Sequence, residues 1–409
     1  MSRQFILLDH SIVDAGGHYL EYARSLLSAA KAEGFRTVLA INQHALDLEC
    51  PEADLIIKPF SKTFWENQAQ SKIRTIAGFL FNKIGMGVQL ACAEKFAGEL
   101  AILIRQAEIN DSDIVFIPTL GATELIGISL YSGCKAAARI HWNLLFRRDV
   151  PPPRAWFDVK SRVVKWQVKS SFIFANEAFK IGTRYFYTDT EDLTYRYEGM
   201  GVGVFNTLPI PIDEHLGYKQ AWHEGPLVVS YIGDMRVEKG GHLLPIIIES
   251  LRNDGFDASR VVFRIQGNLP KGAASRSLLS AKKALTSKKW SGVEVLDGPL
   301  SRETYRDLLL GSDVVLLPYS TTNYAARSSG VFAEAVAAGI PTIHPRDSWM
   351  GKNSFSMAQQ GYGGEDNIAE KIKSVIQKYK YFETASFQFS KKWRSIHSAK
   401  RLTKILVNK

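Results

Sequence analysis

The chain has 409 residues and a formal net charge of +10, with 45% of its residues hydrophobic and 22% charged. This composition is typical of a soluble globular protein. The length exceeds one ordinary hydrophobic core, so we expect two domains of roughly 200 residues each.

The sequence also argues against secretion and against a membrane span. The three cysteines are odd in number and lie far apart, at Cys50, Cys92 and Cys134. That spacing disfavours a disulfide framework or a zinc site and favours the reducing cytoplasm. The N-terminal apolar run is too short for a signal peptide. The most apolar long segment, 76–93, is interrupted by Asn82 and Lys83 and does not fit a membrane span.

The two halves of the chain open with the same pattern. In the first half, a strand at 5–9 leads through a loop with two glycines into an apolar-periodic helix at 19–30. In the second half, a strand at 227–232 leads through another glycine pair into a helix. Later in each half comes a buried-looking strand, at 112–118 and at 312–318. Short apolar strands that alternate with amphipathic helices predict parallel sheets covered on both faces.

We therefore predict an α/β fold of two Rossmann-like domains whose parallel sheets face a central cleft. Pro209 and Pro211 make the connector extended, because each proline forces the preceding residue out of the helical region. The predicted domains are 1–212 and 213–384. A basic C-terminal helix at 385–409 is expected to cross back to the first domain.

Basic residues gather in two segments. Residues 384–409 hold seven bases and no acid, and residues 154–169 hold five bases against Asp158, together with Trp156 and Trp166. Aromatic residues beside lysine and arginine suit an anionic leaflet, which predicts peripheral contact on the inner membrane face. The alternative is a solvated helix face that is packed on the core by its aromatics. Nucleic acid is not expected as a partner, since no matching binding motif accompanies the charge.

A charged loop follows the first strand of the second half. Residues 233–241 carry Arg236 and Lys239 between glycines. Both cations can neutralise a diphosphate, the arginine as a fork and the lysine as a point charge. The alternative is a turn whose cations pair with Asp234 and Glu238.

The segment 329–341 carries the most specific signal. Ser329, Gly330 and Val331 open a helix without bulky side chains, which exposes free backbone N–H groups to an anion. Glu334, one turn inside, can accept two hydroxyl hydrogen bonds, as from a ribose. The chain order places this helix start and the charged loop at the same sheet edge. Together they predict a site for a nucleotide diphosphate.

The order of these motifs resembles that of nucleotide-sugar glycosyltransferases of the GT-B fold. Arg-x-Glu-Lys-Gly after a strand, a second strand ending at Gly267, and Glu-Ala-x-Ala-x-Gly-x-Pro most resemble the large retaining group, glycosyltransferase family 4. The resemblance is specific over about residues 227–345 and loose in the first domain. It implies a hexosyltransferase that moves a sugar from a nucleotide diphosphate sugar to a glycan or lipid-linked acceptor. The implied setting is bacterial cell-surface polysaccharide synthesis, with retention of configuration.

The resemblance also implies roles for single residues. Arg236 and Lys239 would hold the donor diphosphate and stabilise it as a leaving group, and Glu334 would bind the ribose. The first domain would be the acceptor side and the second would bind the nucleotide sugar. The other donor contacts would come from Gly16, Gly17, Gln266, Gly267, Asn268, Tyr319, Ser329, Gly330 and Val331.

Cations and a histidine near the middle of the first domain are further candidates. His141 is expected at a strand end, where relatives often carry a histidine near the sugar's primary hydroxyl; a structural histidine is the alternative. Arg147 and Arg148 would bind an acidic or phosphate-bearing acceptor, or else form surface charge.

Two positions depart from the family pattern. The family commonly has a glutamate eight residues before Glu334, in contact with the donor sugar, where this chain has Ala326. Its arginine usually follows the strand glycine directly, where this chain has Asp234. Contacts to the sugar hydroxyls would then fall to other side chains, for which the candidates are Asn323, Arg327 and Ser328.

Neither a metal nor another cofactor is expected, since arginine, lysine and a helix start suffice for the phosphates. Asp111 and Asp113 mimic an Asp-x-Asp metal site, but they precede a strand and are interpreted as a turn. Two other functions stay open. An epimerase of the same fold would need first-domain carboxylates, for which Asp9, Asp14 and Glu124 are the candidates, and an inactive nucleotide-sugar-binding partner would need none.

Overall fold

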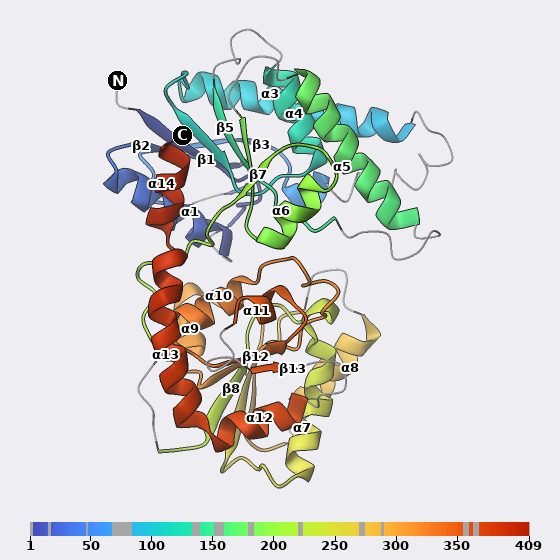
Figure 1. Ribbon diagram of the computed structural model, residues 1–409, viewed down its shortest axis with the longest axis vertical. Helices are drawn as coiled ribbons and strands as arrows, with labels where there is room; N and C mark the ends of the chain where they lie inside the picture. Colours follow the sequence, from blue (N-terminus) through green and yellow to red (C-terminus); the bar gives the residue numbers. More distant parts are fainter. Residues whose placement is uncertain are drawn as a thin grey trace. The chain divides into compact units, whose positions relative to one another are not determined.

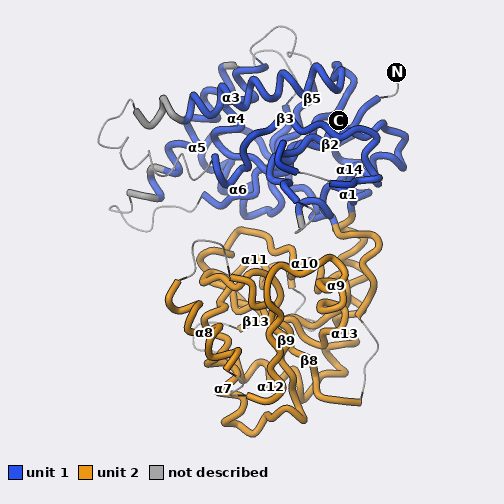
Figure 2. Tube along the Cα trace, turned by 180° about the vertical axis from the view of Figure 1, so that it is seen from behind, with its two compact units in different colours: residues 1–211, 399–409 blue, residues 212–398 orange. Residues whose placement is uncertain are grey.

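The structure, a computed structural model, describes residues 3–14, 18–45, 48–67, 84–132, 140–150, 159–178, 184–219, 224–269, 275–287, 290–354, 360–362 and 368–408. The chain divides into two compact units, shown in two colours in Figure 2. Unit 1 contains residues 1–211 and 399–409, and unit 2 contains residues 212–398. The division after Pro211 falls next to the predicted boundary at residues 212–213.

Unit 1 is built on a seven-stranded sheet in the order β3-β2-β1-β4-β5-β6-β7, in which every pairing is parallel. Its strands are β1 (Gln4–Leu8), β2 (Arg36–Asn42), β3 (Leu55–Phe60), β4 (Ile114–Ile117), β5 (His141–Leu145), β6 (Arg184–Thr188) and β7 (Phe205–Thr207). Parallel strands align their carboxyl ends along one edge, and the loops that follow these strands therefore meet at that edge.

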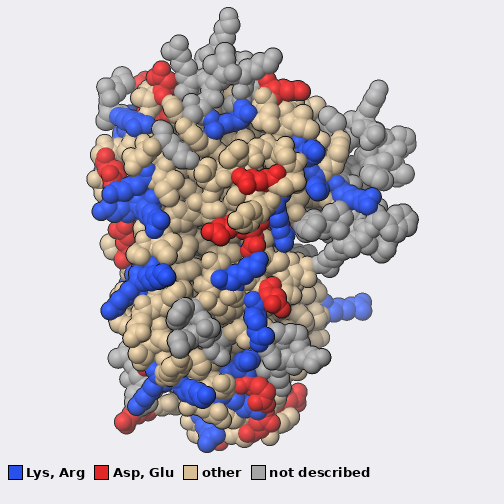
Figure 3. All heavy atoms as spheres, in the orientation of Figure 1, with Lys and Arg blue, Asp and Glu red and all other residues tan. Residues whose placement is uncertain are grey.

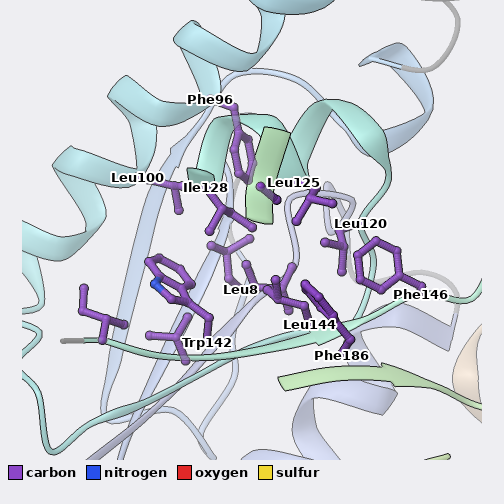
Figure 4. Close-up of a cluster of buried hydrophobic side chains, with 14 of the residues drawn as sticks. Leu8, Phe96, Leu100, Leu120, Leu125, Ile128, Trp142, Leu144, Phe146 and Phe186 are labelled. Atoms are coloured by element: carbon purple, nitrogen blue, oxygen red, sulfur yellow. The ribbon is translucent and has the colours of Figure 1, made fainter. Parts of the chain in front are cut away.

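Helices cover both faces of this sheet, because successive side chains of a strand point to opposite faces. Ile6 and Leu8 of β1 join the core under one group of helices, part of which is shown in Figure 4, whereas Phe5 and Leu7 join the other core. The first group is α3 (Ile84–Gln106), α4 (Ala122–Ser132) and α5 (Val159–Ala178). The second is α1 (His18–Ala32) and α14 (Ala399–Val407), while α6 (Glu191–Glu198) follows β6.

Unit 2 contains a second parallel sheet, of six strands, in the order β10-β9-β8-β11-β12-β13. Figure 1 labels β8, β12 and β13 of this sheet. Its strands are β8 (Leu227–Tyr231), β9 (Val261–Gln266), β10 (Val293–Leu296), β11 (Val314–Leu316), β12 (Thr342–Pro345) and β13 (Gln360–Tyr362). Its helices are α7 (Leu244–Asn253), α8 (Arg276–Thr286), α9 (Arg302–Leu310), α10 (Gly330–Ala337), α11 (Trp349–Lys352), α12 (Ile368–Gln377) and α13 (Tyr379–Ile396). The predicted α/β class and the two parallel sheets are confirmed.

Each face of the unit 2 sheet has its own packing. One face is a core of aliphatic and aromatic side chains to which α7, α8 and α12 contribute. On the other, the ring of Phe332 in α10 lies edge-on to Trp349 and Trp393, at 5.7 Å and 5.9 Å between centroids. A left-handed Gly339 (φ 76°) ends α10, and the N–H of Ile340 donates to the carbonyl of Ala335. Gly339 therefore terminates the helix.

The C-terminal segment differs from the single helix predicted at 385–409. The helix α13 ends at Ile396, His397 has a non-helical backbone (φ −106°, ψ 76°), and Ser398 pairs with Ile212 in a β-bridge. Only α14, which begins at Ala399, belongs to unit 1. The extended backbone at Ser398 breaks the helix where the chain passes from one unit to the other.

The basic C-terminal segment is not uniformly a surface for a partner. Arg394 donates to the carbonyls of Ala337, Leu216 and Gly217 inside unit 2. The face seen in Figure 3 carries Lys and Arg side chains together with Asp and Glu side chains. Among the described residues, no helix is long and apolar enough to cross a membrane.

Candidate functional site

Three loops meet at the carboxyl edge of the unit 2 sheet. Gly233 follows β8, Gly267 follows β9, and Tyr319 follows β11. Because these strands are parallel neighbours, the loops that follow them converge. Three hydrogen bonds tie the segments after β8 and β9 together. The Gly233 N–H donates to Gln266 Oε1, Asn268 Nδ2 donates to Asp234 Oδ1, and the Met235 N–H donates to the Asn268 carbonyl, each at 2.7 Å.

Two glycines give the first loop its path. Gly233 has φ 101° and Gly240 has φ 71°, both in the left-handed region that favours glycine. A Cβ added at Gly240 would lie 1.9 Å from the carbonyl oxygen of Pro318. The loop that carries the two predicted cations is therefore held tightly against the segment that follows β11.

Arg236 has two acidic neighbours. Its guanidinium donates to Asp234 Oδ2 at 2.7 Å and lies 3.9 Å from Glu238 Oε1. Burial by itself would lower the pKa of Arg236, but the hydrogen bond and charge of Asp234 outweigh it and raise the pKa. For Arg236, the turn with internal ion pairs, which was the alternative interpretation, is what the structure contains.

Lys239 is different, because no ion pair joins it to an acid within the described part of the chain. A Cβ added at Gly233 would meet Lys239 Nζ at 2.8 Å and Val331 Cγ2 at 3.8 Å, so the ammonium group and the first turn of α10 converge on Gly233. The same ammonium lies 5.8 Å from the ring centroid of the buried Tyr319. Burial, and then the positive charge of Arg236, lower the pKa of Lys239 to about 8.

The helix α10 begins with a side-chain N-cap, and there is open space next to its first residue. Ser329 Oγ accepts from the N–H of Phe332, whereas nothing lies within 4 Å of a Cβ added at Gly330. Open space therefore borders this helix start at Gly330, and the backbone N–H groups of a helix start attract anions. This brings together four of the predicted donor residues, Lys239, Tyr319, Gly330 and Val331.

Glu334, one turn into α10, is held by a residue that the sequence analysis missed. The hydroxyl of Tyr305 in α9 donates to Glu334 Oε2. Burial, and then the charge of Glu334, raise the pKa of Tyr305 well above its ordinary value. The tyrosine lies 29 residues before the glutamate, so only the packing of α9 near α10 reveals the pair.

Gly267 and Asn268 shape this site from β9. A Cβ added at Gly267 would lie 2.6 Å from Val295 Cγ1, and the Gly267 N–H donates to the Leu296 carbonyl. Asn268 holds Asp234 and, through its carbonyl, the N–H of Met235. In this structure both residues position the charged loop.

At the carboxyl edge of the unit 1 sheet, two buried carboxylates accept hydrogen bonds. Burial raises the pKa of Asp9, which accepts from the Ser11 N–H at 3.0 Å and from the Thr119 hydroxyl at 3.3 Å. Glu124 accepts from Asn67 Nδ2 at 3.1 Å and from the Gly121 N–H at 2.9 Å. His10, wholly buried among phenylalanine rings, has Nε2 3.5 Å from Glu124 Oε1.

Arg147 is also paired. Its Nε donates to Asp189 Oδ2 at 3.0 Å, and its guanidinium lies 5.2 Å from the ring centroid of Tyr22. Burial by itself would lower the pKa of Arg147, but the charge of Asp189 outweighs it and raises the pKa. Arg147, whose side chain is 25% exposed, is therefore an ion-paired cation at the edge of the unit. Arg148, its neighbour, lies 5.6 Å and 6.0 Å from the ring centroids of Phe64 and Trp65.

The predicted position of His141 is wrong. His141 is the first residue of β5, so it lies at the amino edge of the sheet, opposite the edge where ligands of such sheets bind. The strand β5 extends from His141 to Leu145. Gly16 and Gly17, the other predicted residues of the first domain, lie outside the described residues. Within the described ranges, no group of three or more His, Cys, Asp or Glu side chains is arranged to hold a metal ion.

Comparison with solved structures shows that the chain has the GT-B fold of two Rossmann-like units. It matches sucrose-phosphate synthase from Thermosynechococcus elongatus with a TM-score of 0.68 and 13% identity over 99% of this chain and 98% of that one. Anabaena HepE in complex with UDP-glucose matches with a TM-score of 0.66 and 11% identity over 99% and 98%. A glycosyltransferase from Rickettsia africae matches with a TM-score of 0.63 and 12% identity over 100% and 98%. No protein-family model and no curated protein matches the sequence.

Proposed function

We propose that this protein is a glycosyltransferase that moves a hexosyl group from a nucleotide diphosphate sugar to a glycan or lipid-linked acceptor. The observation that carries the proposal is the convergence of the Lys239 ammonium and the open start of α10 on Gly233. A cation beside free backbone N–H groups suits the two phosphates of such a donor. The UDP-glucose bound by HepE, which has the same fold, supports the same donor class.

Each group at the site has a distinct part in the proposed reaction. Lys239 and the N–H groups of Gly330 and Val331 hold the diphosphate and stabilise the charge that grows on it as the sugar departs. Arg236 strengthens this field, although Asp234 and Glu238 offset much of its charge. Glu334, oriented by Tyr305, binds the ribose hydroxyls. Protein groups, rather than a metal ion, meet the phosphate charge in this proposal.

Transfer is favoured over isomerisation by the state of the unit 1 carboxylates. Asp9 and Glu124, two of the acids that an epimerase would need, are 2% and 0% exposed and accept hydrogen bonds from their own unit. We propose retention by front-face attack, in which the acceptor hydroxyl loses its proton to the departing phosphate. The proposed setting is bacterial cell-surface polysaccharide synthesis in the cytoplasm.

The donor part of the proposal is tested with nucleotides alone. We expect one of UDP, GDP, ADP and dTDP to raise the melting temperature, because ligand binding stabilises the folded state by mass action. Lys239→Ala and Glu334→Ala should abolish this shift and sugar transfer without unfolding the protein. Lys373→Ala is the matched control, since Lys373 pairs with Asp254 and Glu370 outside the site. Normal turnover in Lys239→Ala would overturn the proposal.

We also propose that α5 touches an anionic membrane surface. Arg162, Trp166, Lys169 and Ile173 form one exposed stripe at helical spacing, in which bases alternate with large apolar side chains. Such a stripe suits the interface of an anionic leaflet. Ile173→Ser should weaken co-sedimentation with phosphatidylglycerol vesicles. Ile102→Ser changes a similarly exposed isoleucine on α3, and it should not. Equal losses in both variants would remove the assignment.

A further inference from the structure

Two cations of unit 2 lie over a pair of buried tyrosine rings. Tyr319 and Tyr324 have centroids 4.6 Å apart and are 3% and 4% exposed. Lys239 Nζ is 5.8 Å from the centroid of Tyr319, and Arg327 Cζ is 5.1 Å from that of Tyr324. Each cation thus lies over its own ring of one packed pair, and the positive field of Arg327 reaches Lys239, where it helps to lower that pKa.

These two cations share a property that Arg236 lacks. Arg236 is already paired with both Asp234 and Glu238. Within the described ranges, no ion pair or hydrogen bond joins Arg327 or Lys239 to an acid. A cation–π contact stabilises a partly exposed guanidinium only weakly compared with an ion pair to a carboxylate. An anion that reaches Arg327 would therefore meet a positive charge that its own protein has not neutralised.

The layout of the donor indicates which anion this is. A nucleotide sugar is linear, with the diphosphate between the nucleoside and the sugar. The diphosphate is assigned to Lys239 and the start of α10, and the nucleoside to Glu334, which lies further along that helix. Arg327 precedes the N-cap Ser329, on the other side of the helix start along the chain. The part of the donor left for Arg327 is the sugar.

We propose that Arg327 binds a carboxylate on the transferred sugar, so that the donor is a nucleotide diphosphate hexuronate. A guanidinium presents a planar fork that matches a carboxylate with two parallel hydrogen bonds. The inference rests on the proposed function, and it narrows the substrate class of the same site. A neutral hexose would leave this charge without an anionic partner.

The experiment compares three ligands on the full chain by calorimetry: UDP, UDP-glucose and UDP-glucuronate. UDP-glucuronate should bind about 10- to 100-fold more tightly than UDP-glucose, the range expected for a hydrogen bond between charged groups. Arg327→Ala should remove this preference and leave the affinity for UDP unchanged. Arg327→Lys, which keeps the charge without the fork, should retain part of it. Arg260→Ala is the matched control, because Arg260 also lies over a ring, that of Phe256, at 5.3 Å.

The other outcomes separate the inference from the proposed function. Equal affinity of the unmodified protein for the two sugar nucleotides would overturn the inference and leave the glycosyltransferase proposal intact. A loss of UDP binding in Arg327→Ala as large as the loss of UDP-glucuronate binding would also overturn it, because Arg327 would then hold a phosphate. Failure of the unmodified protein to bind UDP in any form would overturn the UDP donor and this inference with it.

Discussion

The carboxyl edges of the two sheets each carry a cation near an aromatic ring, but the two cations differ in their partners. Arg147 in unit 1 lies over Tyr22 and is bound to Asp189, whose side chain is 3% exposed. Lys239 in unit 2 lies over Tyr319 beside an open helix start and has a pKa lowered to about 8. The cation at this sheet edge is therefore already paired with an acid in unit 1, whereas in unit 2 it can still pair with a bound anion.

The difference shows that a cation at a ligand-binding edge is not by itself a ligand site. A buried cation stays charged when it is paired with an acid. If either member of the pair is removed, the other is left as a buried charge whose desolvation cost is no longer compensated. Burial lowers the pKa of a cation that has no acidic partner, and a bound anion then stabilises its charged form. Variants that change one unit and not the other can test this contrast.

The largest effect is expected for the glycine that fixes the cationic loop. Gly240→Ala puts a Cβ 1.9 Å from the Pro318 carbonyl oxygen in a left-handed backbone, so it should destabilise unit 2 by at least about 4 kcal/mol. Gly255→Ala has a similar backbone (φ 79°) and free space, and should cost only about 1–2 kcal/mol. Urea unfolding of both variants measures the difference. Equal costs would mean that the loop is not held against Pro318.

Much of unit 2 could be predicted from the sequence because its signals are local. The strand predicted at 227–232 is Leu227–Tyr231, and the helix start predicted from Ser329 is Gly330 with Ser329 as its cap. These features depend on apolar runs, small residues and glycines within a few positions of one another. A single segment therefore contains the information that fixes them.

Two of the failures depend on contacts between distant segments, and the third depends on where a short strand ends. Arg147 was open to an interpretation as surface charge, because Asp189 lies 42 residues away in the chain. The tyrosine that orients Glu334 comes from another helix. His141 was placed at the wrong end of β5, because the apolar residues Leu144 and Leu145 continue the strand past it. Sequence periodicity does not set the end of so short a strand.

Removing Arg147 should lower the stability of the protein, whereas removing Lys239 should abolish donor binding without lowering the stability. Arg147→Met removes the cation that binds the buried Asp189 carboxylate and should destabilise unit 1 by about 3 kcal/mol. Lys239→Met removes an unpaired cation, so it should leave unfolding in urea unchanged or raise the midpoint, while UDP-glucose binding is lost. The contrast fails if Lys239→Met destabilises the protein as much as Arg147→Met does.

The pH dependence of donor binding should come from Lys239. Its pKa is about 8 in the free protein, and a bound diphosphate favours the charged form. The affinity for UDP-glucose should therefore be constant below pH 7 and fall as the pH rises through 8, by about tenfold between pH 7.5 and 9.5. Lys239→Arg should remove this slope, because arginine stays charged. Calorimetry at fixed ionic strength measures both, and a flat profile in the unmodified protein would contradict the assignment.

The smallest effect tests how Glu334 is positioned. Tyr305→Phe removes the hydroxyl that donates to Glu334 and should weaken UDP binding by about fivefold, the value of one hydrogen bond. If Tyr305→Phe only loosened the fold, the affinities for UDP and 2′-deoxy-UDP would fall equally. If it misplaces Glu334, the preference for UDP over 2′-deoxy-UDP should decrease. Tyr195→Phe, at a tyrosine that is 71% exposed in unit 1, is the control and should change neither affinity. If Tyr305→Phe lowers the melting temperature but keeps the ribose preference, then Tyr305 supports the fold of unit 2 and not the site.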